Sequence, residues 1–417
     1  MAAGKEEGTV SLVQGENFIA ILRTACGNGK LPLENPDWDC LADWARSQSL
    51  AALFYTGATQ YQEFFSWEKK GQQRLQQETI ATVVSQSTRT QLFLELYQQL
   101  LEAKLHPVVL KGILVRRLYG SLADYRPSCD EDLYVLPEEA ARCRNVLEKN
   151  GFQVTTPVDL QQLSDPHQEV SMDGGDGLLH LELHPQFFEQ SREDLKLSEG
   201  SFRASHEQKI SVEVGGVPLW TLDETRHYLY LFLHLAKHFK GAGVGIRQVM
   251  DLMMFDRVCG EKIDWNVIRQ AAEELHCGSL YGDVAALGKK LGFSPTELFP
   301  SYNPELLLAD SLEGGVYGHS SAARSYGSIV TGSALNGDGK ERLLRTIFPT
   351  FEYMTRSWPV LKQRPWLLPI GYGRRFYKFF IQRRHGLVAL PAIQKGKERS
   401  NLLRSYGILP GRNKGRR

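Results

Sequence analysis

Two carboxylates lie two residues apart where a polar loop gives way to an apolar run. Asp130 and Asp132 precede Leu133-Tyr134-Val135, and alternate side chains of a β-strand face the same side. Two carboxylates on one strand face offer the hard oxygen ligands that Mg²⁺ prefers. The pattern predicts metal-assisted phosphoryl or nucleotidyl transfer, with Mg²⁺ or Mn²⁺ as the ion.

Nearby residues are suited to binding phosphate. The apolar run 108–110 predicts a buried strand that ends at Lys111-Gly112, where backbone N–H groups would approach a phosphate. Lys111 would place an ammonium charge near the β- or γ-phosphate, and Arg126 would form bidentate contacts with phosphate oxygens. Ser128 would hydrogen-bond a phosphate or brace the turn. A lysine in a loop also commonly just meets solvent, so both interpretations of Lys111 stay open.

A third carboxylate lies on a predicted hairpin. Its strands are residues 169–172 and 178–184, and its turn is the Asp-Gly-Gly-Asp-Gly run at 173–177. On the second strand an apolar face alternates with a polar face. The apolar face carries Leu179, Leu181 and Leu183, and the polar face carries His180, Glu182 and His184. We interpret His184 as support for the site rather than as a catalytic group.

Two later helices add polar residues. The predicted helix 223–238 places His227, Leu231, His234 and His238 on one face. His234 and His238 have metal-ligand spacing, but the sequence offers no evident third ligand, which favours packing, support of the site or substrate contact. In the predicted helix 246–258, Arg247 and Asp251 are spaced to pair with each other, or to reach substrate.

The run Leu110-Lys111-Gly112, Tyr119, Arg126 and Asp130-x-Asp132 resembles a bacterial family of uncharacterised nucleotidyltransferases. The nucleotidyltransferase superfamily has a glycine turn, a short helix, an Asp-x-Asp strand and a third carboxylate on a later strand. The pattern from Arg126 to Asp132 is also similar to abortive-infection nucleotidyltransferases of toxin–antitoxin systems. One departure is the turn, which in the superfamily is usually Gly-Gly or Gly-Ser. Gly120-Ser121 is therefore an alternative to Lys111-Gly112.

The resemblance implies a metal-dependent transfer of a nucleoside monophosphate from a nucleoside triphosphate to a hydroxyl acceptor. Asp130, Asp132 and Glu182 would hold the ions, and Glu182 is the preferred base. The acceptor is open among a protein, a sugar, another small molecule and RNA. Two alternatives are an inactive member that serves as an interaction protein and a kinase-like phosphoryl transferase.

Composition predicts an ordinary intracellular protein. The 417 residues carry a net charge of +1, which gives no overall field for nucleic acid or membranes. The first ten residues have no apolar core of signal-peptide type and the sequence has no apolar run of transmembrane length, so we expect a cytoplasmic location. The six cysteines form no CxxC pair, which favours reduced thiols, and Cys129 is predicted to face the core: Cys26, Cys40, Cys129, Cys143, Cys259, Cys277.

The predicted fold class is α/β, a nucleotidyltransferase-type mixed sheet flanked by helices. We divide the chain into an N-terminal helical module at 1–104, a catalytic domain at 105–260, a helical region at 261–385 and a basic, partly disordered tail at 386–417. Residues 314–339 are rich in Gly and Ser and predict a linker. The basic and aromatic region 341–385 is open among ordinary packing, a groove for RNA, and a surface for an anionic lipid or a protein.

Overall fold

The computed structural model describes residues 3–155, 169–187, 202, 208–316, 351, 354–355, 358, 360–381 and 389–409. These residues belong to two compact units, which we describe separately. The first unit contains residues 1–235 and 246–312, and the second contains residues 236–245 and 313–417. The predicted four-part division of the chain stays a prediction.

The first unit begins with helices. They are α1 (Ala3–Ala25), α2 (Trp38–Ser47), α3 (Ala51–Ala58), the 3-10 helix η1 (Gln62–Ser66) and α4 (Lys69–Glu102). Asp37 caps α2, because its side chain accepts a hydrogen bond from the Cys40 N–H. Phe18 of α1 stacks on Phe54 of α3, with ring centroids 5.7 Å apart. The buried apolar side of each helix thus holds the bundle together.

A five-stranded mixed sheet follows, with strand order β1-β2-β5-β4-β3. The strands are β1 (Val108–Val109), β2 (Glu131–Tyr134), β3 (Gln153–Val154), β4 (Val170–Gly174) and β5 (Leu179–His184). The β2 and β5 strands pair in parallel, and the other neighbours pair antiparallel. Between β1 and β2 the chain forms α5 (Ile113–Arg116) and the 3-10 segment η2 (Arg117–Tyr125).

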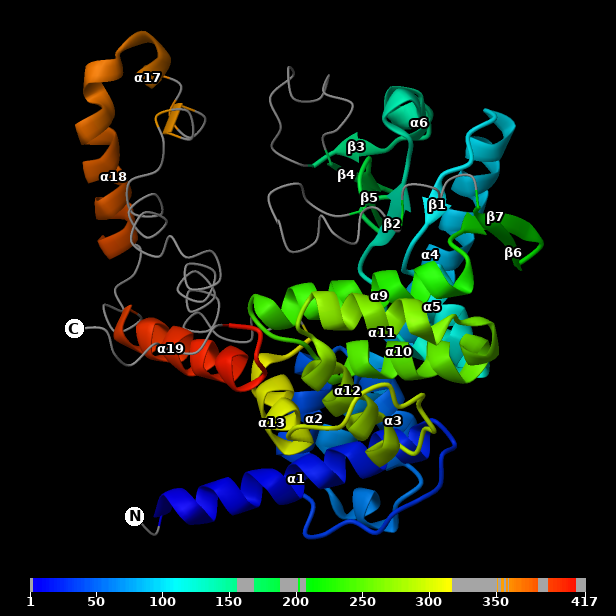
Figure 1. The fold of residues 1–417 in the computed structure, drawn as a ribbon, viewed down its shortest axis with the longest axis vertical. Coiled ribbons are helices and arrows are strands. Elements are labelled where there is room, and N and C mark those ends of the chain that lie inside the picture. Colours follow the sequence, from blue (N-terminus) through cyan, green and yellow to red (C-terminus); the bar gives the residue numbers. More distant parts are fainter. Residues whose placement is uncertain are drawn as a thin grey trace. The chain divides into compact units, whose positions relative to one another are not determined.

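The two faces of the sheet differ in character. Leu133, Leu181 and Met172 lie on one face and are fully buried, in a core with residues of α4 and of α6 (Pro137–Lys149). Figure 1 shows α4 and α6 beside the sheet. Because side chains alternate along a strand, Asp132 and Glu182 must face the opposite side. The apolar face therefore anchors the sheet and leaves the polar face for chemistry.

A hairpin and further helices follow. The hairpin is β6 (Ile210–Val214) and β7 (Val217–Thr221), and the helices begin with α9 (Glu224–Lys240) and α10 (Ile246–Cys259). The 3-10 helix η3 (Gly260–Lys262), α11 (Trp265–Glu274), α12 (Gly278–Lys290) and α13 (Pro304–Gly314) complete the series. The first unit includes α9 up to residue 235 and α13 up to residue 312, and the last residues of both helices belong to the second unit. Phe255 of α10 packs edge to face against His227 and Tyr228 of α9, with ring centroids 5.0 and 6.0 Å apart. The predicted mixed α/β fold with flanking helices is confirmed.

The second unit contains α17 (Val360–Gln363), the 3-10 helix η4 (Pro365–Leu367), α18 (Leu368–Ile381) and α19 (Ala389–Ser405). In α19, Arg399 donates to the Gly241 carbonyl at 3.1 Å. Tyr406, just after α19, meets Phe239 edge to face. Residues 389–405 are helical within the stretch 386–417, and the prediction that this tail is partly disordered stays a prediction.

Other predictions lie partly outside the described residues. The Gly- and Ser-rich segment 314–339 is described only to residue 316, and the basic aromatic region only in part. No helix among the described residues is both long and apolar enough to cross a membrane. An anionic partner of the basic aromatic region stays a prediction.

The end of β1 is held by two side chains from later in the chain. Thr221 Oγ1 donates to the Val109 carbonyl at 2.7 Å, and His227 Nε2 donates to the Leu110 carbonyl at 2.7 Å. Burial lowers the pKa of His227 to about 4, although the Leu110 hydrogen bond opposes the shift. His227 is therefore a neutral, buried donor that fixes the backbone immediately before Lys111.

His227 should make stability depend on pH. Its pKa is lower in the folded protein than its ordinary value, so its contribution is present above about pH 6.5 and is lost as the pH falls towards 4. Between pH 7.5 and 5 the wild type should lose about 2 kcal/mol more unfolding free energy than His227→Gln, measured by urea denaturation. His276→Gln, at an exposed position, is the control. Equal pH slopes for wild type and His227→Gln would contradict the prediction.

Candidate active site

Two carboxylates face each other across the parallel pair of strands. In the register of β2 and β5, Asp132 is opposite Glu182, and His184 lies two residues further on the same face. His184 Nε2 lies 2.9 Å from Asp132 Oδ1 and 3.3 Å from Glu182 Oε2. One ligand atom from each of these three residues lies within 4.8 Å of the other two. Carboxylate and imidazole donors this close can hold a divalent cation.

Lys111 joins this group from the turn after β1. Its Nζ lies 3.0 Å from Asp132 Oδ2 and 3.1 Å from His234 Nε2 of α9. Burial disfavours the ammonium form, but the charges of Asp132, Tyr230 and Asp130 and the hydrogen bond to Asp132 together outweigh it, so the pKa of Lys111 is raised. The turn, β2, β5 and α9 therefore converge on one point.

Neighbouring charges and hydrogen bonds determine the pKa values of the acidic and basic side chains in this site. Burial would raise the pKa of Asp132, but the Lys111 charge and the His184 hydrogen bond lower it below the ordinary range. Burial would lower the pKa of His184, but hydrogen bonds to Asp132, Glu169 and Glu182 raise it well above its usual value. Asp130 differs, because burial and the charge of Asp132 raise its pKa. Asp132 is thus a carboxylate that meets two cationic groups.

Asp130 lies immediately before β2 rather than within it, and is half-buried. Among the described residues the group with metal-ligand geometry is Asp132, Glu182 and His184, and Asp130 is outside it. A metal-binding role for Asp130 stays a prediction. Because β2 begins only at Glu131, the two aspartates do not hold equivalent positions on the strand.

Arg126 and Asp251 form a buried ion pair. Arg126 Nε lies 3.0 Å from Asp251 Oδ1, and Nη2 lies 2.5 Å from Oδ2. Tyr119 Oη donates to the same carboxylate at 2.8 Å. The pairing ties α10 to the loop before β2 and occupies two guanidinium nitrogens that the sequence analysis assigned to phosphate. Contact of Arg126 with phosphate stays a prediction.

The other polar residues of the later helices have separate positions. Arg247 donates to the Pro127 carbonyl at 3.2 Å, and its charge lowers the pKa of Asp130, against the larger effect of burial. The predicted Arg247–Asp251 pair thus gives way to contacts of both residues with the segment before β2. His238 belongs to the second unit, and the site described here does not depend on it.

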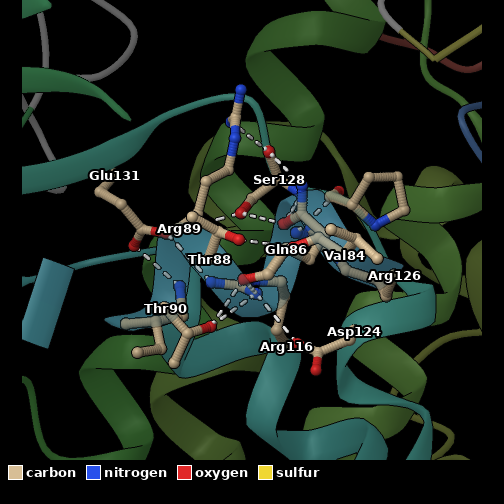
Figure 2. A network of polar contacts seen from close by, with 12 residues as sticks. Val84, Gln86, Thr88, Arg89, Thr90, Arg116, Asp124, Arg126, Ser128 and Glu131 are labelled. Atoms are coloured by element: carbon tan, nitrogen blue, oxygen red, sulfur yellow. Dashed lines mark hydrogen bonds and ion pairs between the residues drawn. The ribbon is translucent and has the colours of Figure 1, made fainter. Parts of the chain in front are cut away.

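A polar network joins α4 to the loop before β2 (Figure 2). The Ser128 N–H donates to Gln86 Oε1 at 3.0 Å, and Gln86 Nε2 donates to the Ser128 carbonyl at 3.2 Å. Arg89 Nη1 donates to the Ser128 and Cys129 carbonyls at 2.8 and 2.9 Å. Ser128 is buried among these partners, which supports the bracing role that was one of its two predicted roles.

Glu131, between the two aspartates, has a role that the sequence analysis missed. It is buried on the opposite side of the strand, and its Oε2 accepts a hydrogen bond from the Ile113 N–H at 2.8 Å. Arg116 Nη2 lies 3.5 Å from its Oε1. Burial raises the pKa of Glu131 to about 7, although the Arg116 charge and the Ile113 N–H oppose the shift. Glu131 thus connects the strand that bears Asp132 to the turn that bears Lys111.

The prediction that Cys129 faces the core is wrong. The sequence analysis assumed a regular strand through residue 129, which would direct the thiol to the core. Cys129 is exposed, because β2 begins only at Glu131. The buried position on that side of the strand belongs to Glu131.

The two candidate glycine turns have the same backbone conformation in different surroundings. Gly112 has φ 61° and ψ −117°, and Gly120 has φ 59° and ψ −124°. A Cβ on Gly112 would lie 1.9 Å from Glu131 Oε2, whereas one on Gly120 would meet nothing within 4 Å. Gly112 also directly follows Lys111. These contacts favour Lys111-Gly112 as the turn of the site.

Replacement of Gly112 should disrupt the site more than replacement of Gly120. Gly112→Ala should lower the unfolding free energy by the roughly 1–3 kcal/mol of strained backbone and by a further steric cost against Glu131. Gly120→Ala, with the same backbone strain and open space around the new methyl, is the matched control. Urea denaturation of both variants measures the difference. Equal losses would show that the Glu131 contact does not restrict residue 112.

Arg126→Gln should destabilise the protein, because Asp251 would remain buried without its cation. We expect a loss of about 3–5 kcal/mol in thermal or urea denaturation. Asp251→Asn combined with Arg126→Gln should cost less than the sum of the single changes. Arg74→Gln, which removes an exposed partner of Glu78, should cost less than about 1 kcal/mol. Additive effects of Arg126→Gln and Asp251→Asn would exclude a direct pair.

Comparison with known proteins gives one match. A family described as uncharacterised nucleotidyltransferase matches residues 34–291, more than half of the 417 residues. Comparison with curated proteins and with solved structures finds no match. The matched range includes the Lys111-Gly112 turn, both strands that carry the paired carboxylates, and α9 and α10, and it supports nucleotidyl transfer as the general activity. The chain therefore belongs to the uncharacterised nucleotidyltransferase family.

Proposed function

We propose that this protein transfers a nucleoside monophosphate from a nucleoside triphosphate to a hydroxyl acceptor and releases pyrophosphate. The observation that carries the proposal is the cross-strand pair of Asp132 and Glu182, with His184 and Lys111 beside it. A divalent cation, Mg²⁺ or Mn²⁺, bound by such residues would neutralise charge on the triphosphate. Family membership supports the same class of reaction.

The residues of the chain would divide the remaining tasks. The acceptor oxygen forms a bond to the α-phosphorus, the bond from that phosphorus to the bridging oxygen of the β-phosphate breaks, and the acceptor proton passes to a carboxylate. Glu182 is our candidate base, because its side chain is partly exposed at the edge of the cluster. Lys111, from the glycine turn, would contact the β- or γ-phosphate.

The buried supports would hold these groups in position. Glu131 fixes the Lys111-Gly112 turn to β2, and the Gln86 and Arg89 contacts fix the loop that precedes β2. Arg126 and Asp251 brace the same loop from α10. Positioning of this kind matters because transfer requires the acceptor oxygen, the α-phosphorus and the leaving oxygen in line.

The activity can be measured with each of the four α-³²P nucleoside triphosphates and Mg²⁺ or Mn²⁺. The potential acceptors are the protein itself, total RNA and a cell extract. We expect label in one of these acceptors together with released pyrophosphate. Asp132→Asn should reduce transfer by about 10²–10³-fold, the usual loss when one group that stabilises transition-state charge is removed. Asp43→Asn, at a surface position of α2, is the matched control and should retain activity.

Other products would point elsewhere. Release of a nucleoside diphosphate instead of pyrophosphate would indicate kinase-like chemistry. Absence of transfer and of metal-dependent nucleotide binding under all conditions would contradict the proposal and leave an interaction protein with this fold. The labelled species would identify the chemical class of the acceptor.

A further inference from the structure

His184 contacts a different carboxylate with each of its ring nitrogens. Nε2 faces Asp132 Oδ1 at 2.9 Å and Glu182 Oε2 at 3.3 Å. Nδ1 lies 3.2 Å from Glu169 Oε2, on the other side of the ring. Glu169 directly precedes β4, whose first residue, Val170, pairs with Leu183 of β5. The sheet register therefore places Glu169 beside His184.

This arrangement matches the surroundings of a metal-bound histidine. A histidine that binds a metal through one nitrogen commonly uses the other to hydrogen-bond a carboxylate, which fixes the ring and its tautomer. Glu169 is in the position of that carboxylate, and Nε2 is directed at the two carboxylates that would share the ion. A histidine that served only to fill space on the polar face would not need a carboxylate on both nitrogens.

The donor set also bears on the identity of the ion. Mg²⁺ strongly prefers oxygen ligands, whereas imidazole nitrogen suits divalent transition metals and carboxylates suit Mn²⁺ as well as Mg²⁺. Asp132, Glu182 and His184 supply two carboxylates and one imidazole. Mn²⁺ accepts both kinds of donor, so replacing a third carboxylate by His184 should shift the preference of the site away from Mg²⁺.

We propose that His184 gives up its Nε2 proton to solvent and binds the divalent cation directly through that nitrogen, held in place by Glu169, and that the resulting site prefers Mn²⁺ to Mg²⁺. The inference rests on the proposed function only in that it concerns the same site, since it is a statement about ligands and not about turnover. It assigns His184 a ligand role where the sequence analysis gave it a supporting one, and it gives Glu169 the role of a positioning residue.

Electron paramagnetic resonance of the full chain loaded with Mn²⁺ tests the ligand directly. Electron spin echo modulation should show coupling to an imidazole nitrogen in the wild type, and the coupling should disappear in His184→Gln. His106→Gln, at a half-buried position beside Trp220, is the control and should retain the coupling. Bound Mn²⁺ without nitrogen coupling in the wild type would overturn the proposal, and so would failure to bind Mn²⁺.

Glu169→Gln separates the positioning role from folding, because the Glu169 side chain is 45% exposed. It should weaken Mn²⁺ binding by about 10–100-fold, the usual effect of removing such a carboxylate. His184→Gln should weaken Mn²⁺ binding at least as much, and Mg²⁺ binding less, as measured by competition with Mn²⁺. Equal loss for both ions in His184→Gln would contradict the preference, and unchanged Mn²⁺ affinity in Glu169→Gln would contradict the role of Glu169.

The binding measurements need no nucleotide and no acceptor, so the two proposals can fail separately. Nitrogen coupling without any nucleotidyl transfer would retain the metal site and remove the proposed reaction. Transfer that proceeds with bound Mn²⁺ and no nitrogen coupling would retain the reaction and remove His184 from the ligand set.

Discussion

The parallel pairing of β2 with β5 is the constraint on which the site depends. It places Asp132 directly opposite Glu182, and two like charges on neighbouring strands repel each other. Lys111 and His184 offset that repulsion, because both contact Asp132. The same sheet positions both cationic side chains, because Lys111 follows β1 and His184 lies on β5. A shift of one residue in this register would turn Glu182 to the apolar face and separate the group.

The Asp-Glu-Asp run at 130–132 shows how one strand serves both the site and the core. Alternation sends Asp132 to the polar face and Glu131 into the interior, where an unpaired carboxylate would be costly. Arg116 and the Ile113 N–H compensate Glu131, and Gly112 leaves the space that its carboxylate occupies. Contacts on both faces of the sheet therefore connect the Lys111-Gly112 turn to β2. Glu131 makes the contact on the buried face, and Asp132 makes the contact on the polar face.

Local pattern predicted much of this fold, and distant partners account for the rest. The alternation of residues 178–184, the strand before Lys111 and the helix 223–238 are visible in the sequence, and the structure has each of them. The pairing of Arg126 with Asp251 is not visible in the sequence, because the two residues are 125 positions apart and no local spacing links them. Arg247 and Asp251 have the spacing of a helix pair, yet both turn to the loop before β2. Glu131 was missed because an acidic residue among acidic residues gives no sign of burial.

The charges of the site bear on what a metal ion must do there. Lys111 and His184 already compensate the charge of Asp132, so the protein's own cationic groups stabilise this arrangement. A metal ion that binds must therefore interact with the carboxylates more favourably than Lys111 and His184 do. Under the proposed function, a nucleoside triphosphate would favour that exchange, because its phosphates would give Lys111 a new anionic partner when the ion bound Asp132. Under the proposed function, the 3.0 Å contact between Lys111 Nζ and Asp132 Oδ2 would therefore make cation binding and nucleotide binding depend on each other electrostatically.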